Sequence, residues 1–192
     1  MIFEGVITTC TPDAEPHVTP MGFRRDGVHI VLRPFVPSAT LANLTSHPQA
    51  VISLTDDVRV IAGCLTGRRE WPLHDADVIT GWRIDECLSH LELIVLERIE
   101  DAQRPTFRCE IVHETNHRPF AGFNRAQAAV VEAAILVSRL DFIDTAKLEA
   151  ELTYLHIAVT KTAGKRESTA WHWLLDAISV HPRHTFKVEQ LR

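Results

Sequence analysis

The segment between two short apolar runs, Val28–Leu32 and Ala50–Leu54, most constrains what this chain can fold into. Both runs are rich in β-branched residues, as buried strands are. Between them, Pro37 ends the incoming extended chain, Ser38 is a favourable helix N-cap, and Pro48 ends the helix that follows. The sequence therefore predicts a strand, a short helix that starts at Ser38, and a second strand.

The start of this helix has two possible roles. A capping box would place Glu or Gln three residues after Ser38, but that position holds Leu41. The free backbone N–H groups, the positive end of the helix dipole and the hydroxyls of Ser38 and Thr40 can together bind a phosphate. Ser38 can equally be an ordinary cap, and spacing alone favours this simpler interpretation.

The composition excludes several classes of protein. A chain of 192 residues, 45% of them hydrophobic and 23% charged, can form one large domain or a domain with an appendage. A net charge of −5 argues against a nucleic-acid partner or an anionic membrane surface. No apolar run approaches the roughly 20 residues that span a bilayer, and the N-terminus lacks the basic region of a signal peptide. We therefore expect a cytoplasmic protein.

The four cysteines are widely scattered and form no C-x-x-C pair. This spacing is typical of buried free thiols in a cytosolic protein and gives no support to a disulfide framework or a zinc site.

The first 118 residues have mostly strand character, and the turns between the strands are short. The predicted strands are Ile2–Cys10, His17–Phe23, Val28–Leu32, Ala50–Leu54, Leu91–Glu100 and Phe107–His113. Five or six antiparallel strands of this kind predict a closed or nearly closed β-barrel. The stretch Asp57–Trp82 has a mixed pattern that fits a short helix and a loop.

From Asn124 onwards the apolar residues recur with helical spacing. Three stripes follow one another, within 130–140, 148–159 and 171–178. Asn124 is well placed to cap the first helix and Asp144 to cap the second. The predicted fold is thus a β-barrel plus α, with a barrel domain over 1–118 and a small helical domain over 119–192.

The usual catalytic signatures do not occur in this sequence. It contains no G-x-S-x-G, G-x-G-x-x-G or Walker motif, so triad hydrolysis, dinucleotide binding on a Rossmann fold and P-loop chemistry have no support. His113 and His117 are four residues apart, but their segment is extended and then looped, and a metal pair there would need further ligands. Glu114 is next to His113, but nothing in the sequence fixes its position relative to the two histidines. We therefore predict no metal site.

Several segments in this order resemble the FMN-binding split barrel, the fold of flavin reductases and pyridoxamine-phosphate oxidase relatives. More closely, the chain resembles domain-of-unknown-function family 447 (DUF447), whose members carry a helical C-terminal extension after the barrel. The segments that carry the resemblance are His17–Gly22, Phe35–Ser38, Thr40–Leu44, Thr55–Asp57 and Gly122–Ala129. The resemblance covers nearly the whole chain, and it favours a ligand role for Ser38 and Thr40.

The resemblance implies a homodimer with FMN between the barrels of two subunits. The phosphate would contact Ser38, Thr40 and Asn43. The isoalloxazine ring would lie along the segment formed by Thr19, Pro20, Met21 and Gly22. Further cofactor contacts are implied for Thr55, Asp57, Asn124 and Arg125.

One position departs from the pattern of related sites, which often carry Arg or Lys beside the helix-start hydroxyl. Here that position is Ala39, so either Arg33 or Arg24 would supply the positive charge, or FMN would bind more weakly. Arg125 stands at a helix start, where the dipole favours anions, and this placement suits a bound anionic group. The alternative is that Asn124 caps the helix while Arg125 pairs with a surface carboxylate.

A flavin accepts and donates hydride itself, which accounts for the missing catalytic motifs. The resemblance implies an FMN-dependent oxidoreductase that acts on a small cofactor or metabolite. Family members often occur near tetrahydromethanopterin-linked one-carbon genes, which suggests a pterin. The alternative is a non-catalytic flavoprotein that carries or senses FMN or binds partners through the helical extension. A third possibility is another ligand, such as a deazaflavin or haem, because fold does not fix function.

Overall fold

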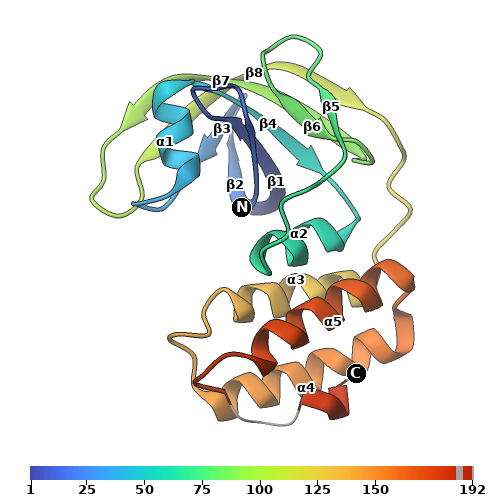
Figure 1. The fold of residues 1–192 in the computed structure, drawn as a ribbon. Helices are drawn as coiled ribbons and strands as arrows, with labels where there is room; N and C mark the ends of the chain where they lie inside the picture. The colour runs from blue at the N-terminus through green and yellow to red at the C-terminus, as the bar shows by residue number, and fades with distance from the viewer. Residues whose placement is uncertain (185–187, 192) are drawn as a thin grey trace. The chain divides into compact units, whose positions relative to one another are not determined.

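A computed structural model of the protein describes residues 1–184 and 188–191. The chain forms two compact units (Figure 1). The first comprises Met1–Thr55 and Glu70–Phe120, and the second comprises Asp56–Arg69 and Ala121–Arg192.

The first unit is built on a closed antiparallel barrel with the strand order β1-β2-β3-β8-β7-β4 (Figure 1). The barrel strands are β1 (Ile2–Cys10), β2 (Pro16–Asp26), β3 (His29–Leu32), β4 (Gln49–Leu54), β7 (Ser89–Ile99) and β8 (Thr106–Asn116). Every neighbouring pair runs antiparallel, including β1 with β4, which closes the barrel. The predicted antiparallel barrel is confirmed.

The barrel core is formed by alternate residues of each strand. On β8, Phe107 and Cys109 are buried on the core face. The alternation of the sequence would put His113 on that same face, but this expectation is wrong, because the β8 bulge places His113 opposite Glu92. The register of β7 and β8 shifts at two places. Between Glu92 and Leu93 a bulge gives β8 an extra residue, and between Val95 and Glu97 the extra residue is on β7. Burial raises the pKa of the Cys109 thiol to about 12. All four cysteines are free and buried, as predicted.

Two smaller elements complete the first unit. The helix α1 (Ala39–Ser46) joins β3 to β4 and contacts β1 and β2. A separate two-stranded sheet, β5 (Leu73–Asp75) with β6 (Trp82–Ile84), lies in a stretch for which no strand was predicted.

The second unit is helical. Its elements are α2 (Val58–Leu65), α3 (Arg125–Val137), α4 (Thr145–Thr162), α5 (Lys165–Ser179) and the 3-10 turn η1 (Val188–Leu191). The three predicted helices are present as α3, α4 and α5, and Asn124 and Asp144 cap the first two as predicted. Trp171 is buried in the core, and its indole N–H donates to the carbonyl of Leu191 at 2.8 Å.

The two compact units differ from the predicted domains, 1–118 and 119–192, chiefly in the place of one segment. Asp56–Arg69 belongs with the helical unit, because Val58 and Ala62 of α2 are part of the core formed by α3, α4 and α5. The short helix expected within Asp57–Trp82 is therefore present, but it packs against helices that follow much later in the chain. Across the described residues, no helix combines the length and apolar character needed to cross a membrane.

Candidate functional site

The link between β3 and α1 is where the sequence places a phosphate. Ser38 is the N-cap of α1: its Oγ accepts from the backbone N–H of Leu41 at 3.2 Å. The first turn carries no acidic side chain. The capping role of Ser38 is confirmed.

Capping does not use up the hydrogen-bonding capacity of this helix start. A hydroxyl has one donor as well as two acceptor sites, so Ser38 can cap through an acceptor site and still donate its O–H outward. The N–H groups of Ala39 and Thr40 lie in the first turn, where helical geometry provides no partner within the helix. Three donors, the Ser38 hydroxyl and two backbone N–H groups, can therefore face an anion here.

Asn43 has a mainly structural role in the unliganded geometry. Its side chain is buried and its Nδ2 donates to Oγ1 of Thr9 at 3.0 Å, which ties α1 to β1. Thr40 is also buried, on the same helix.

Arg33 follows β3 and has unused donor capacity. Its Nη2 lies 3.5 Å from the carbonyl of Arg104, and its Nε is buried with no hydrogen-bond partner in the described part of the chain. A buried donor without a partner is costly, and that cost is removed when an acceptor arrives. Arg24, the other cation considered, is exposed on β2.

The segment Thr19–Gly22 lies on β2 and pairs with Gly5, Val6 and other residues of β1 along one edge. On the opposite edge, β3 pairs only with Phe23–Asp26. In the strand pairings that the structure describes, this edge of Thr19–Gly22 is open. A Cβ at Gly22 would lie 3.0 Å from Cγ2 of Ile2, so the side-chain space beside Gly22 is occupied by β1.

Thr55 directly follows β4 in the first unit, whereas Asp57 belongs to the second. Asp57 caps α2 by accepting from the N–H of Arg59 at 3.1 Å, and it forms ion pairs with Arg59 and Arg166. Burial favours the neutral acid, but the hydrogen bonds and charge of Arg59, together with the charge of Arg166, lower the pKa of Asp57 below its ordinary value.

Asn124 and Arg125 also lie in the second unit, at the start of α3. Asn124 accepts from the N–H groups of Ala126 and Gln127 at 2.8 and 3.2 Å, so it is a cap. Arg125 lines a surface hollow between α3 and α4, together with Glu132 and Tyr154. The predicted flavin contacts of Thr55, Asp57, Asn124 and Arg125 remain predictions.

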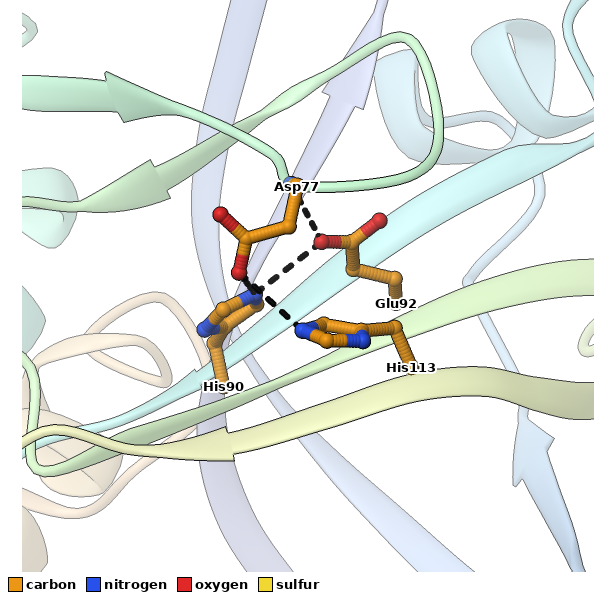
Figure 2. Close-up of side chains that lie close together, drawn as sticks. All are labelled: Asp77, His90, Glu92 and His113. Carbon is orange, nitrogen blue, oxygen red and sulfur yellow. Dashed lines mark hydrogen bonds and ion pairs between the residues drawn. The ribbon is translucent and has the colours of Figure 1, made fainter.

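Sequence reasoning missed a cluster of polar side chains on the barrel, formed by Asp77, His90, Glu92 and His113 (Figure 2). His117 and Glu114, the neighbours considered for His113, have other partners: His117 Nε2 lies 2.8 Å from His90 Nδ1, and Glu114 pairs with Arg25 at 3.3 Å. The available signal was the spacing of His90 and Glu92. Residues two apart on a strand share one face.

Glu92 is buried and ionised. Burial alone would raise its pKa, but hydrogen bonds from the backbone N–H of Ile79, from His90 and from the N–H groups of Asp77 and Val78 lower the pKa below its ordinary value. The carboxylate therefore fastens the loop between β5 and β6 to β7.

Comparison with protein families shows which family this chain belongs to. The N-terminal domain of the proteins of unknown function called DUF447 matches residues 3–118, and the C-terminal domain matches 124–176. The chain belongs to the DUF447 family. A comparison with curated protein sequences finds no match.

Solved structures include a DUF447 protein with the same fold. The FMN-bound protein from Methanosarcina mazei is 16% identical, with a TM-score of 0.80 over 92% of this chain and 94% of that one. The NADH:FAD oxidoreductase of Streptomyces globisporus matches 61% of this chain and 77% of its own, with 14% identity and a TM-score of 0.52. The 2-nitrobenzoate 2-nitroreductase of Pseudomonas fluorescens matches 59% and 64%, with 17% identity and a TM-score of 0.51.

The ion pairs of Asp57 predict that part of the free energy of unfolding is lost at acidic pH. Because the folded-state pKa of Asp57 is depressed below 3.8, its carboxylate stabilises the fold above that pH and the contribution is lost as the pH falls below it. Asp57→Asn keeps a capping oxygen and removes the charge. We expect about 1–3 kcal/mol lower unfolding free energy at pH 7 and a smaller difference from the parent at pH 3. Urea unfolding followed by helical circular dichroism measures both values.

Asp144→Asn is the matched control, because Asp144 caps α4 from an exposed position and Asn caps equally well. A loss for Asp57→Asn that is the same at both pH values would contradict a role for the carboxylate charge.

Proposed function

We propose that this protein binds FMN and acts as an oxidoreductase on a small cofactor or metabolite. The observation that carries the proposal is the structural match to an FMN-bound member of the same family over 92% of the chain. The barrel alone also matches a flavin-linked oxidoreductase and a nitroreductase, although at 14% and 17% identity. These likenesses support the proposed reaction class without naming a substrate.

The start of α1 is the proposed seat of the FMN phosphate. The hydroxyls of Ser38 and Thr40 and the N–H groups of Ala39 and Thr40 would donate to phosphate oxygens, and the helix dipole adds a favourable field. The first turn has no acidic side chain that would oppose an anion. Asn43 would act indirectly, because its bond to Thr9 fixes α1 against β1.

Arg33 is the proposed source of the positive charge that Ala39 does not provide. Its buried Nε has no hydrogen-bond partner among the residues that the structure describes, and a phosphate oxygen is an acceptor of suitable charge. The carbonyl of Arg33 accepts from Nη2 of Arg104 at 3.0 Å, so the backbone at this position is anchored to the β7–β8 hairpin. The backbone of Arg33 is thus fixed, while its side chain offers a donor that no described residue satisfies.

The open edge of β2 is the proposed contact for the isoalloxazine ring. Backbone groups of Thr19–Gly22 that point away from β1 have no strand partner there and can bond the polar edge of a ring. When bound, FMN supplies hydride transfer, so the chain's task is to orient it and to limit solvent access. A pterin is the substrate class we propose, on the family resemblance.

The first prediction is flavin binding itself. Purified protein should bind FMN with micromolar or tighter affinity, about −8 kcal/mol or better, measured by quenching of flavin fluorescence. An oxidoreductase should also oxidise NAD(P)H or another donor through the bound flavin, whereas a carrier should bind without turnover. No response to FMN would rule out the cofactor assignment.

The phosphate seat predicts a difference between FMN and riboflavin, which lacks the phosphate. Ser38→Ala and Thr40→Ala should each weaken FMN binding by roughly 1.5–3 kcal/mol, because charge-assisted hydrogen bonds are lost. Riboflavin affinity should change much less. Equal losses for both ligands would mean that these residues act only on the helix.

Two further variants separate capping from binding. Ser38→Asp keeps a good N-cap but adds a negative charge, so it should preserve stability and still abolish phosphate-dependent affinity. Ser46→Ala removes a hydroxyl at the other end of α1, where Ser46 bonds the carbonyls of Ala42 and Asn43, and should leave FMN affinity unchanged.

We also propose that the protein is a homodimer. Large apolar side chains are exposed on the barrel, with Ile2 on β1 66% exposed and Leu96 on β7 51% exposed. A second copy that covers such surface would stabilise it, and two-fold pairing is the commonest solution. Sedimentation at micromolar concentration should give a dimer with or without FMN. A monomer at that concentration would contradict a site shared between subunits.

A further inference from the structure

Four side chains from three separate segments converge on the outer face of the barrel (Figure 2). Leu91 and Leu93 of β7 point into the barrel core, so the residues that alternate with them point outward. The bulge in β8 then sets His113 directly opposite Glu92. The four are Asp77 from the β5–β6 loop, His90 and Glu92 from β7, and His113 from β8.

One side of the cluster is buried in the protein, and the other side is accessible to solvent. His90 and Glu92 are fully buried, whereas the side chains of Asp77 and His113 are 51% and 31% exposed. An ion could therefore reach the cluster from solvent between Asp77 and His113, while the other two groups are held rigidly below.

The ligand atoms are spaced as a single small cation requires. Oδ2 of Asp77 lies 3.0 Å from Nε2 of His113 and 3.6 Å from Nε2 of His90. Oε1 of Glu92 lies 3.1 Å from the same His90 nitrogen, and all four atoms lie within 4.8 Å of one another. Ligands in a tetrahedron around Zn²⁺, at about 2.0–2.2 Å from the metal, are separated by about 3.3–3.6 Å.

We propose that Asp77, His90, Glu92 and His113 bind a divalent transition-metal ion, with Zn²⁺ as the reference metal. Imidazole nitrogens and carboxylate oxygens are established zinc ligands. Two carboxylates with two neutral imidazoles carry a charge of −2, which a divalent cation balances. The bound ion would join the β5–β6 loop to β7 and β8.

The surroundings of His90 match those of a metal-binding histidine. With Nε2 on the ion, Nδ1 carries the proton and donates to Nε2 of His117, which lies 2.8 Å away. The two rings are stacked, with centroids 5.1 Å apart and planes 7° apart. Such an outer partner fixes the tautomer and orientation of a ligating imidazole.

Hydrogen bonding offers the competing account of the same geometry. Nε2 of His113 also lies 2.7 Å from Oγ1 of Thr115, and metal binding would replace this bond. Hydrogen bonds alone, however, leave His90 with one Nε2 proton facing both Glu92 and Asp77. A cation between them interacts with both carboxylates at once.

The test uses untagged full-length protein freed of metal by dialysis against a chelator. Titration with Zn²⁺ by calorimetry should show one saturable site per chain, and bound Zn²⁺ should raise the melting temperature. Co²⁺ should give the intense visible bands of tetrahedral nitrogen and oxygen coordination. Neither readout needs flavin, so failure here and failure of FMN binding are distinguishable.

His113→Ala and Asp77→Asn are the informative variants, because both side chains are partly exposed and their loss leaves the buried pair intact. Each should weaken Zn²⁺ at least about 10–100-fold, the loss typical of even an outer partner. His74→Ala is the control: His74 pairs with Asp85 at 3.2 Å in an exposed two-residue pair and should leave Zn²⁺ affinity unchanged.

Two results would overturn the site: no saturable Zn²⁺ binding by the parent protein, or equal Zn²⁺ affinity in the parent, His113→Ala and Asp77→Asn. If either variant fails to fold, the Co²⁺ spectrum of the parent decides. Tetrahedral bands support the site, and the weak spectrum of an octahedral aquo ion refutes it.

Discussion

Closure of the barrel by β1 and β4 is the constraint on which the rest of the first unit depends. Val6, Ile7 and Thr8 pair with Ser53, Ile52 and Val51, while β3 pairs with β2 and β8. Strands β3 and β4 are consecutive in the chain but are not neighbours in the barrel, so the chain between them must cross from one side to the other. The helix α1 is that crossing, and it contacts β1 and β2, with Asn43 bonded to Thr9 of β1.

Local patterns predicted most of the fold, because each barrel strand and each late helix carries its own signal. β1 matches its predicted bounds, and Asn124 and Asp144 cap the helices assigned to them. The segment from Asp56 to Arg69 was harder, because its destination depends on contacts with residues more than a hundred positions away. Asp57 and Arg166 form one such pair. No local pattern contains that information.

The sequence predicted more of the phosphate seat at the start of α1 than of the polar cluster on the barrel. The proposed phosphate seat is contiguous, so the sequence could name Ser38 and Thr40 as candidates, although only the family resemblance favoured a ligand over simple capping. The buried Nε of Arg33, which has no partner among the described residues, emerged only in three dimensions. The polar cluster depends on a bulge that skips one residue of β8 and on a loop fastened by Glu92. Neither can be deduced from one sequence, although His90 and Glu92 on one strand face were a visible sign.

A comparison of Asp57 with Glu92 supports a cation site at the polar cluster on the barrel. Both carboxylates are buried and accept backbone hydrogen bonds, but their side-chain partners differ in charge. Asp57 has the guanidinium groups of Arg59 and Arg166, so its charge is balanced locally. Glu92 is held by backbone N–H groups and by His90, which are dipoles unless the imidazole takes up a proton. With Asp77 added at the rim, the described partners leave negative charge that a metal ion would neutralise.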